Sequence, residues 1–239
     1  MTGVQTCALS DLKTGYVKYT SHLDLLRIFK RSFKKCGLAL RYSQGFNPHP
    51  KMGFAQPLSL GYSSLCELIE FETAADHDPN EILKKMQDTL PEGLEPVSCQ
   101  RFDQNIKSLA GEADSAVYTV WIPVPPEAAD QWTSEIAETT AESYLSQNEI
   151  TAMKRQKKTK KLAPVDIRKQ IRSLHADVSE SADHEKTLEL TMLLDCGSTS
   201  NLSPELVLTT FCQFAELPVE RYQVEIERKT INFVNNLQF

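Results

Sequence analysis

Short segments in which apolar and polar residues alternate constrain the fold of this chain more than any other feature. Segments 186–196 and 221–228 each place apolar side chains at every second position. Because strand side chains alternate between two faces, both segments predict strands with one buried and one solvated face. Strands of this kind form antiparallel sheets that helices cover on one side. The chain is therefore predicted to be an α+β protein.

Helical patterns separate the predicted strands in an order that repeats. In the first half, strand, helix, strand, strand, helix and strand are predicted over 17–20, 21–37, 38–42, 57–73, 78–90 and 94–102, where 57–73 is either a strand pair or one long bent strand. In the second half, strands are predicted at 117–124, 149–156, 186–196 and 221–228, with helices at 126–146 and 203–215. Segment 164–174 is predicted to be a short helix or irregular. Two β-α-β-β-α-β units in tandem predict two ferredoxin-like domains with antiparallel sheets.

Composition along the chain suggests where these domains begin and end. The first ten residues, MTGVQTCALS, are similar to the translation of a common sequencing adaptor, so 1–10 is predicted to be non-native. The first domain is then 11–102. Segment 103–115 is polar and poorly patterned, which predicts a linker, and the second domain is 116–239.

Segment 21–37 has the pattern of an amphipathic helix. Ser21 is a favourable N-cap, Asp24 completes a capping box, and Gly37 is a favourable C-terminal stop. At about 100° per residue, one arc of this helix is apolar. The opposite arc is basic and holds Arg27, Lys30, Arg31, Lys34 and Lys35. We expect the helix to bury its apolar arc and present the basic arc to solvent.

Positive charge is concentrated in two short regions of an acidic protein. The net charge is −6, yet nine of the 26 Lys and Arg residues lie in 13–51 and nine more in 154–172. Each region contains a single acid, Asp24 in the first and Asp166 in the second. Clustering of this kind is typical of a surface that binds a polyanion. The basic run 154–161 is predicted to form an exposed hairpin arm.

The loop YSQGFNPHPKM, residues 42–52, combines stiffness with reactive and stacking side chains. Pro48 and Pro50 fix the backbone, and Gly45 permits a turn. In one interpretation the loop is a structural corner that closes the end of the core. In the other, Phe46 stacks on a base while neighbouring polar side chains contact base edges and phosphates. Those neighbours are Asn47, His49 and Lys51.

Several classes of protein are excluded or disfavoured by what the sequence lacks. The six cysteines have no zinc-like or cluster-like spacing, and no phosphate-binding or nucleophile-elbow motif is present. No apolar run approaches the ~18 residues of a membrane span, and no signal peptide is evident. We therefore expect a bacterial cytoplasmic protein with reduced thiols, no cofactor and no metal site.

The first half of the chain resembles a known family. Segments SHLDLLR (21–27), YSQGFNPHPKM (42–52) and PLSLGYSS.CELIEF (57–71) are similar to those of the radical-SAM-linked protein family, a bacterial domain of unknown function. The likeness is specific over 13–102 and weaker beyond. It implies a radical SAM partner with a cobalamin-type domain, and genes for ribosomal proteins and an E/G-type ribonuclease nearby. It implies no reaction.

These observations predict a non-catalytic RNA-binding accessory protein that presents tRNA or rRNA to a radical SAM partner for modification or processing. This chain is not predicted to be the radical enzyme, because it lacks the closely spaced cysteines that such a cluster requires. The residues predicted to bind nucleic acid are Arg27, Lys30, Arg31, Lys34, Phe46, Asn47, His49, Lys51, Lys154, Arg155, Lys157 and Lys158.

Two alternatives remain open from the sequence. The first is a metal-independent RNA endonuclease in which His22 or His49 moves the proton and Lys51 or Arg27 steadies the phosphate. A metal site that uses the same histidines with Asp24 is disfavoured, because His22 and Asp24 fall on different helix faces. The second alternative is a protein adaptor whose basic surfaces dock an acidic partner.

Overall fold

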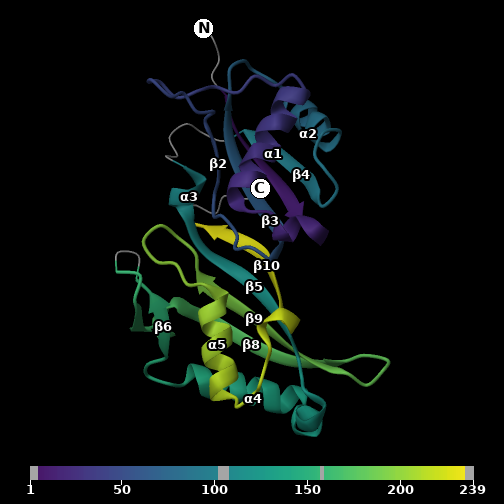
Figure 1. Ribbon diagram of the computed structural model, residues 1–239, viewed down its shortest axis with the longest axis vertical. Coiled ribbons are helices and arrows are strands. Elements are labelled where there is room, and N and C mark those ends of the chain that lie inside the picture. The colour runs from purple at the N-terminus through teal and green to yellow at the C-terminus, as the bar shows by residue number, and fades with distance from the viewer. Residues whose placement is uncertain (1–4, 102–107, 157–158, 235–239) are drawn as a thin grey trace. The chain divides into compact units, whose positions relative to one another are not determined.

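A computed structural model describes residues 5–101, 108–156 and 159–234 (Figure 1). Over these residues the protein is α+β, and its strands pair mostly in antiparallel fashion. The chain divides into two units. Unit 1 contains 1–114 and 231–239, and unit 2 contains 115–230. None of the helices in the described ranges is long and apolar enough to cross a bilayer.

Unit 1 is built from one sheet and the helices that cover it. Its elements are β1 (Gln5–Lys13), η1 (Gly15–Tyr19), α1 (His22–Lys35), β2 (Met52–Phe54), β3 (Ser63–Thr73), α2 (Pro79–Gln87), β4 (Leu94–Arg101) and α3 (Leu109–Glu112). The strand order is β4-β1-β3, and β2 pairs with the other edge of β3. All three of these pairings are antiparallel.

One face of this sheet carries the main core of unit 1. Phe29 and Phe33 lie one turn apart on α1 and are fully buried. They pack with alternate residues of β1 and β3 and with Ile82 and Met86 of α2. Burial of each large apolar side chain contributes about 1.5–3 kcal/mol, so this face holds both helices against the sheet. Figure 1 shows α1 and α2 on the same side of the sheet.

The opposite face of the unit 1 sheet is also covered. Ala8 and Leu68 alternate with the core residues and point to the other side of their strands. There they pack with Leu109 of α3 and with Ile231 and Phe233 near the end of the chain. The sheet of unit 1 therefore offers no open face to a ligand at this position, and its accessible surface lies on helices and loops.

Unit 2 has a sheet, two long helices and a separate hairpin. Its elements are β5 (Ala113–Pro123), η2 (Pro126–Gln131), α4 (Ser134–Leu145), β6 (Thr151–Arg155), β7 (Leu162–Asp166), η3 (Arg168–Gln170), β8 (Ile171–Glu180), β9 (Lys186–Asp195), α5 (Pro204–Phe214), η4 (Arg221–Gln223) and β10 (Glu225–Phe233). The strand order is β10-β5-β9-β8. Strands β6 and β7 pair only with each other among the described strands.

Several elements differ from those predicted. Segment 17–20 belongs to the 3-10 helix η1 rather than to a strand, because its backbone closes i→i+3 bonds such as Thr20 N–H to Val17 O (2.9 Å). Segment 38–42 makes only isolated bridges, from Leu40 to Thr73 and from Tyr42 to Pro50. Its backbone bonds to the end of β3 through Arg41 N–H to Glu72 O and Ala74 N–H to Ala39 O, both 2.8 Å, and this pairing is too short to form a strand.

The second half departs from the prediction at several places, among them 221–223, which form η4 rather than the start of a strand. Segment 164–174 is not a helix but contains parts of β7 and β8, joined by η3. A register shift between Ile171 and Ser173 interrupts the alternation of buried residues at the start of β8, so Ile171 and Leu174 are both buried although they are three residues apart. The helix predicted over 126–146 is divided, because Thr133 caps a new helix by accepting a hydrogen bond from Ile136 N–H.

The two segments predicted to lie outside the domains are partly structured. Of the linker 103–115, residues 103–107 lie outside the described part, whereas 109–112 form α3 and β5 begins at Ala113. Residues 5–10, within the segment predicted to be non-native, form most of β1 and pair with β3 and β4. A central strand at this position completes the sheet of unit 1.

Candidate nucleic-acid interface

Helix α1 begins and ends at the residues that the sequence indicates. The Ser21 hydroxyl accepts a hydrogen bond from Asp24 N–H (3.2 Å) and donates one to the Asp24 carboxylate (2.7 Å). Gly37 follows the helix with φ of +73°, a left-handed conformation that glycine adopts at low cost. These caps fix the first and last turns, so the exposed face of α1 has a defined orientation.

The exposed face of α1 carries a stripe of cations. Lys30, Arg31 and Lys34 are exposed, and none of their side chains makes an ion pair or hydrogen bond with another described residue. We call these three residues the α1 stripe. Arg27 lies on the same face but pairs with the exposed Asp24 at 2.6 Å. The Ser21 hydroxyl and then Arg27 lower the pKa of Asp24, so this carboxylate stays ionised and partly neutralises Arg27.

The loop 42–52 is closed by its own backbone. Ser43 N–H donates to His49 O (2.8 Å), Lys51 N–H donates to Arg41 O (2.8 Å), and His49 N–H donates to the Ser43 hydroxyl (3.0 Å). These bonds join the two arms of the loop below its tip. The loop is therefore both a stiff structural element and an exposed one.

The tip of the loop presents Phe46 to solvent. Its ring is fully exposed, and Asn47 and His49 beside it are exposed as well. Gly45 has φ of +124°, which is strained for any residue with a side chain and turns the tip outward. An aromatic ring held away from the core by a stiff loop is suited to stacking on a ligand.

A carboxylate of β3 holds the base of the loop. Glu72 accepts hydrogen bonds from Lys51 Nζ (2.9 and 3.1 Å) and from Arg41 Nη1 (3.0 Å). Lys51, which was predicted to contact phosphate, is thus engaged in an ion pair on the protein itself. Two cations share one carboxylate, so this cluster retains one net positive charge.

The structure places His22 apart from His49. The His22 ring lies against Phe54, with 5.5 Å between ring centroids, and burial lowers its pKa while Glu67 opposes that change. His49 belongs to the loop whose base is held at Glu72, five residues beyond Glu67 on β3. No hydrogen bond or ring contact joins the two histidines within the described ranges.

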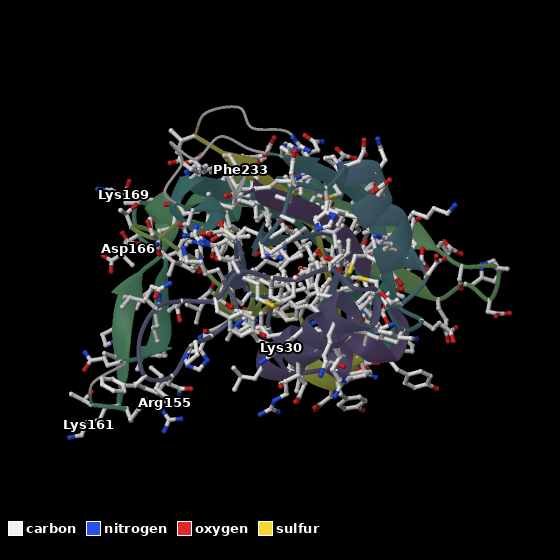
Figure 2. All side chains as sticks on the ribbon, turned by 90° about the horizontal axis from the view of Figure 1, so that it is seen from above. Lys30, Arg155, Lys161, Asp166, Lys169 and Phe233 are labelled. Carbon is white, nitrogen blue, oxygen red and sulfur yellow. The ribbon has the colours of Figure 1, made fainter. Side chains whose placement is uncertain are left out.

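The second basic region divides into an exposed part and a structural part. Lys154, Arg155, Lys160 and Lys161 are exposed on the hairpin β6–β7, and Figure 2 shows Arg155 and Lys161 at its outer end. Lys157 and Lys158, also predicted to bind nucleic acid, lie outside the described residues. By contrast, Arg168 donates to Leu145 O (2.6 Å) and Arg172 pairs with Asp195 (2.7 Å). Those two arginines connect elements of unit 2.

Sequence reasoning missed a histidine–carboxylate pair in unit 2. His175 Nδ1 lies 2.9 Å from Glu138, which also accepts a hydrogen bond from Ala176 N–H (2.7 Å). The Ala176 N–H and then His175 lower the pKa of Glu138. The pair lines a cavity of about 500 Å³ with Asp177 and other polar residues. The partners are 37 residues apart, so no local motif signals them.

No group of three or more His, Cys, Asp or Glu side chains is arranged to hold a metal ion within 5–101, 108–156 and 159–234. Residues 11–204 match the family DUF2344, described as an uncharacterized protein conserved in bacteria. The match spans most of both units. A search of curated proteins finds no match to this chain.

Proposed function

We propose that this chain, which belongs to the bacterial family DUF2344 of uncharacterized proteins, is a cytoplasmic, non-catalytic RNA-binding accessory protein. In this proposal it presents tRNA or rRNA to a radical SAM partner for modification or processing. The proposed contact residues are those of the α1 stripe and the loop 42–52 in unit 1 and, separately, those of the hairpin β6–β7 in unit 2.

The observation that carries this proposal is the set of cations that the protein leaves unneutralised. In a chain with a net charge of −6, the α1 stripe makes no ion pair with a described residue. The exposed ring of Phe46 lies on a loop of the same unit. Exposed cations with an aromatic ring are the combination that binds phosphates and unpaired bases.

The strand orders support two ferredoxin-like units as the finer description of the fold. Orders β4-β1-β3-β2 in unit 1 and β10-β5-β9-β8 in unit 2 correspond to one another. In each unit, one helix connects the first strand of the sheet to the second and another connects the third strand to the fourth. Many modules of this class bind RNA on an open sheet face. In unit 1 that face is covered by Leu109, Ile231 and Phe233, so we place the RNA on the helix and loop side.

The radical SAM partnership rests on the resemblance of segments 21–27 and 42–52 to the radical-SAM-linked family. The same segments contain the exposed residues of α1 and the loop. An endonuclease centred on His22 and His49 has less support, because one ring lies against Phe54 and the other lies on the exposed loop.

RNA binding is tested with the full chain, fluorescently labelled bulk tRNA and rRNA fragments, and a salt series. The variant Lys30→Ala/Lys34→Ala should bind more weakly, and its plot of log affinity against log salt should be shallower by about 1.4, at 0.7 per lost phosphate contact. The control Lys84→Ala/Lys85→Ala removes the same charge from α2 of the same unit and should retain the original slope. Absence of wild-type binding at every salt concentration would overturn the RNA proposal.

The remaining alternatives are separated by two further measurements. The RNA should stay intact throughout the titration, whereas cleavage that His49→Ala abolishes would identify a nuclease. A radical SAM protein with a cobalamin-type domain should be retained by the tagged chain after ribonuclease treatment. If that protein is retained but RNA never binds, the chain is a protein adaptor. If it is not retained under any condition, the proposed partnership is wrong.

A further inference from the structure

The short helix η1 presents two tyrosine rings to solvent. Tyr16 is 94% exposed and Tyr19 is 61% exposed. Because a 3-10 helix has three residues per turn, residues i and i+3 lie above one another on the same face. The two rings therefore project from one side of η1. Neither hydroxyl makes a hydrogen bond with a described residue, and the contact of the Tyr19 ring is with the side chain of Lys18.

The backbone beneath these rings is held at three points. Thr14 N–H donates to Gly93 O (3.0 Å), and Gly61 N–H donates to Lys18 O (2.7 Å). Val17, between the tyrosines, packs against the core of unit 1. Gly93 is in close contact here, because an added Cβ would lie 2.8 Å from Thr14 O. The exposed rings thus stand on an anchored segment rather than on a loose loop.

A lysine lies against one tyrosine, and the α1 stripe follows in the chain. Lys18 Nζ lies 5.5 Å from the centroid of the Tyr19 ring. Helix α1 begins three residues after Tyr19, and exposed Leu23 lies in its first turn. Lys30 and Lys34 follow Leu23 at i+7 and i+11, which is the same side of the helix. The two tyrosines therefore precede, in the chain, a helix side on which Leu23 and two cations of the α1 stripe are aligned.

We propose that Tyr16 and Tyr19 form a stacking platform for unpaired bases of single-stranded RNA, with Lys18 beside a phosphate and the α1 stripe along the following backbone. This inference rests on the proposed RNA-binding function and adds the form of RNA. Flat aromatic faces accept any unpaired base, whereas bases within a duplex are stacked on one another and do not present their faces. The three unneutralised cations of the α1 stripe favour a nucleic acid over an apolar protein segment.

The platform is tested by comparing single-stranded and duplex RNA. Binding of a labelled 12-nucleotide RNA and of its duplex is measured by anisotropy for the full chain and for Tyr16→Ala/Tyr19→Ala. The variant should lose about tenfold or more in affinity for the single strand, the range expected when stacking rings are removed. Its salt dependence should not change, because no charge is lost. Affinity for the duplex should change little.

The chain offers a close control for this substitution. Tyr222 is 82% exposed in another 3-10 helix, η4 of unit 2. Tyr222→Ala should leave both affinities unchanged. Tyr16→Trp/Tyr19→Trp should retain binding, and a 2-aminopurine in the single strand should be quenched by wild type and Trp variant but not by the Ala variant.

The possible outcomes distinguish failure of the stacking proposal from failure of the proposed RNA binding. If Lys30→Ala/Lys34→Ala weakens binding and Tyr16→Ala/Tyr19→Ala does not, the platform is wrong while RNA binding stands. Equal losses for single strand and duplex also overturn the platform. If the wild-type chain binds neither RNA at any salt concentration, both proposals fail. Unchanged circular dichroism and urea midpoints establish that the exposed substitutions leave the fold intact.

Discussion

Substitution of Glu72 should make the protein bind RNA more tightly while making it slightly less stable. Its carboxylate pairs with Arg41 and Lys51 at the base of the loop 42–52. Glu72→Gln keeps the size of the side chain and removes the charge that neutralises one of the two cations. Both cations then become available to phosphates near Phe46. Most surface substitutions at a binding site weaken binding, so an increase in RNA affinity is a stringent test of the reasoning.

The magnitudes follow from the geometry of the two ion pairs. Both are partly exposed, and exposed pairs contribute about 0.2–1 kcal/mol each, so the free energy of unfolding should fall by about 1 kcal/mol. For a chain of this size that corresponds to a decrease in Tm of about 2–4 °C. One newly unneutralised cation steepens the salt dependence by about 0.7, so the affinity advantage should grow about twofold between 150 and 50 mM salt.

The assay is a salt titration of labelled single-stranded RNA against wild type and Glu72→Gln. Glu205→Gln is the matched control, because Glu205 also pairs with an arginine, Arg221, at 2.6 Å in unit 2. It removes the same charge and should leave the slope unchanged. Weaker binding by Glu72→Gln with an unchanged Tm would refute the reasoning, because the ion pair would then be part of the binding surface rather than a competitor for it.

Two predictions concern stability. Burial raises the pKa of Glu70, which accepts a hydrogen bond from Leu109 N–H (2.7 Å), so its protonated form is favoured by folding. Stability should therefore fall as pH rises from the ordinary 4.5 through the raised folded value, and Glu70→Gln should lose this dependence in urea titrations at pH 4.5 and 7.5. Ser21→Ala should lower the free energy of unfolding by about 1 kcal/mol and return the pKa of Asp24 toward its ordinary value, measured by NMR; an unchanged urea midpoint would contradict the capping role.

The sequence predicted those elements whose ends are marked by capping residues or whose apolar residues recur at a regular spacing. Helix α1 was predicted because Ser21 and Gly37 define its ends and the apolar period defines its buried face. Strand β9 was predicted because its alternation is uninterrupted. Strand β8 was not, because basic residues precede it and its edge position is specified by α4, through the bond from Ala176 N–H to Glu138. Contacts between distant segments decide such cases.

In the candidate site, too, some features follow from nearby residues in the sequence and others depend on residues far away in the chain. The exposed position of Phe46 follows from a short stiff loop, which the prolines and glycine indicate. Whether each cation is left exposed or pairs with an acid does not follow from local sequence. Lys51 meets a carboxylate 21 residues away, and Arg172 meets one 23 residues away. The tyrosine pair of η1 was overlooked because a strand was predicted over 17–20, and a strand would not have placed Tyr19 above Tyr16 on one face.

Counting Lys and Arg along the sequence therefore overstates the number of cations available to a ligand, although it identifies the region in which they lie. Of the nine basic residues in 13–51, Lys13 is fully buried, while Arg27, Arg41 and Lys51 pair with acids. The α1 stripe, on the middle and end of α1, is exposed and makes no ion pair with a described residue. A polyanion that bound by net charge alone would be repelled by this acidic chain, so binding must occur where cations lack partners. For that reason substitutions that create or remove partners, such as Glu72→Gln, test the mechanism more directly than removal of cations alone.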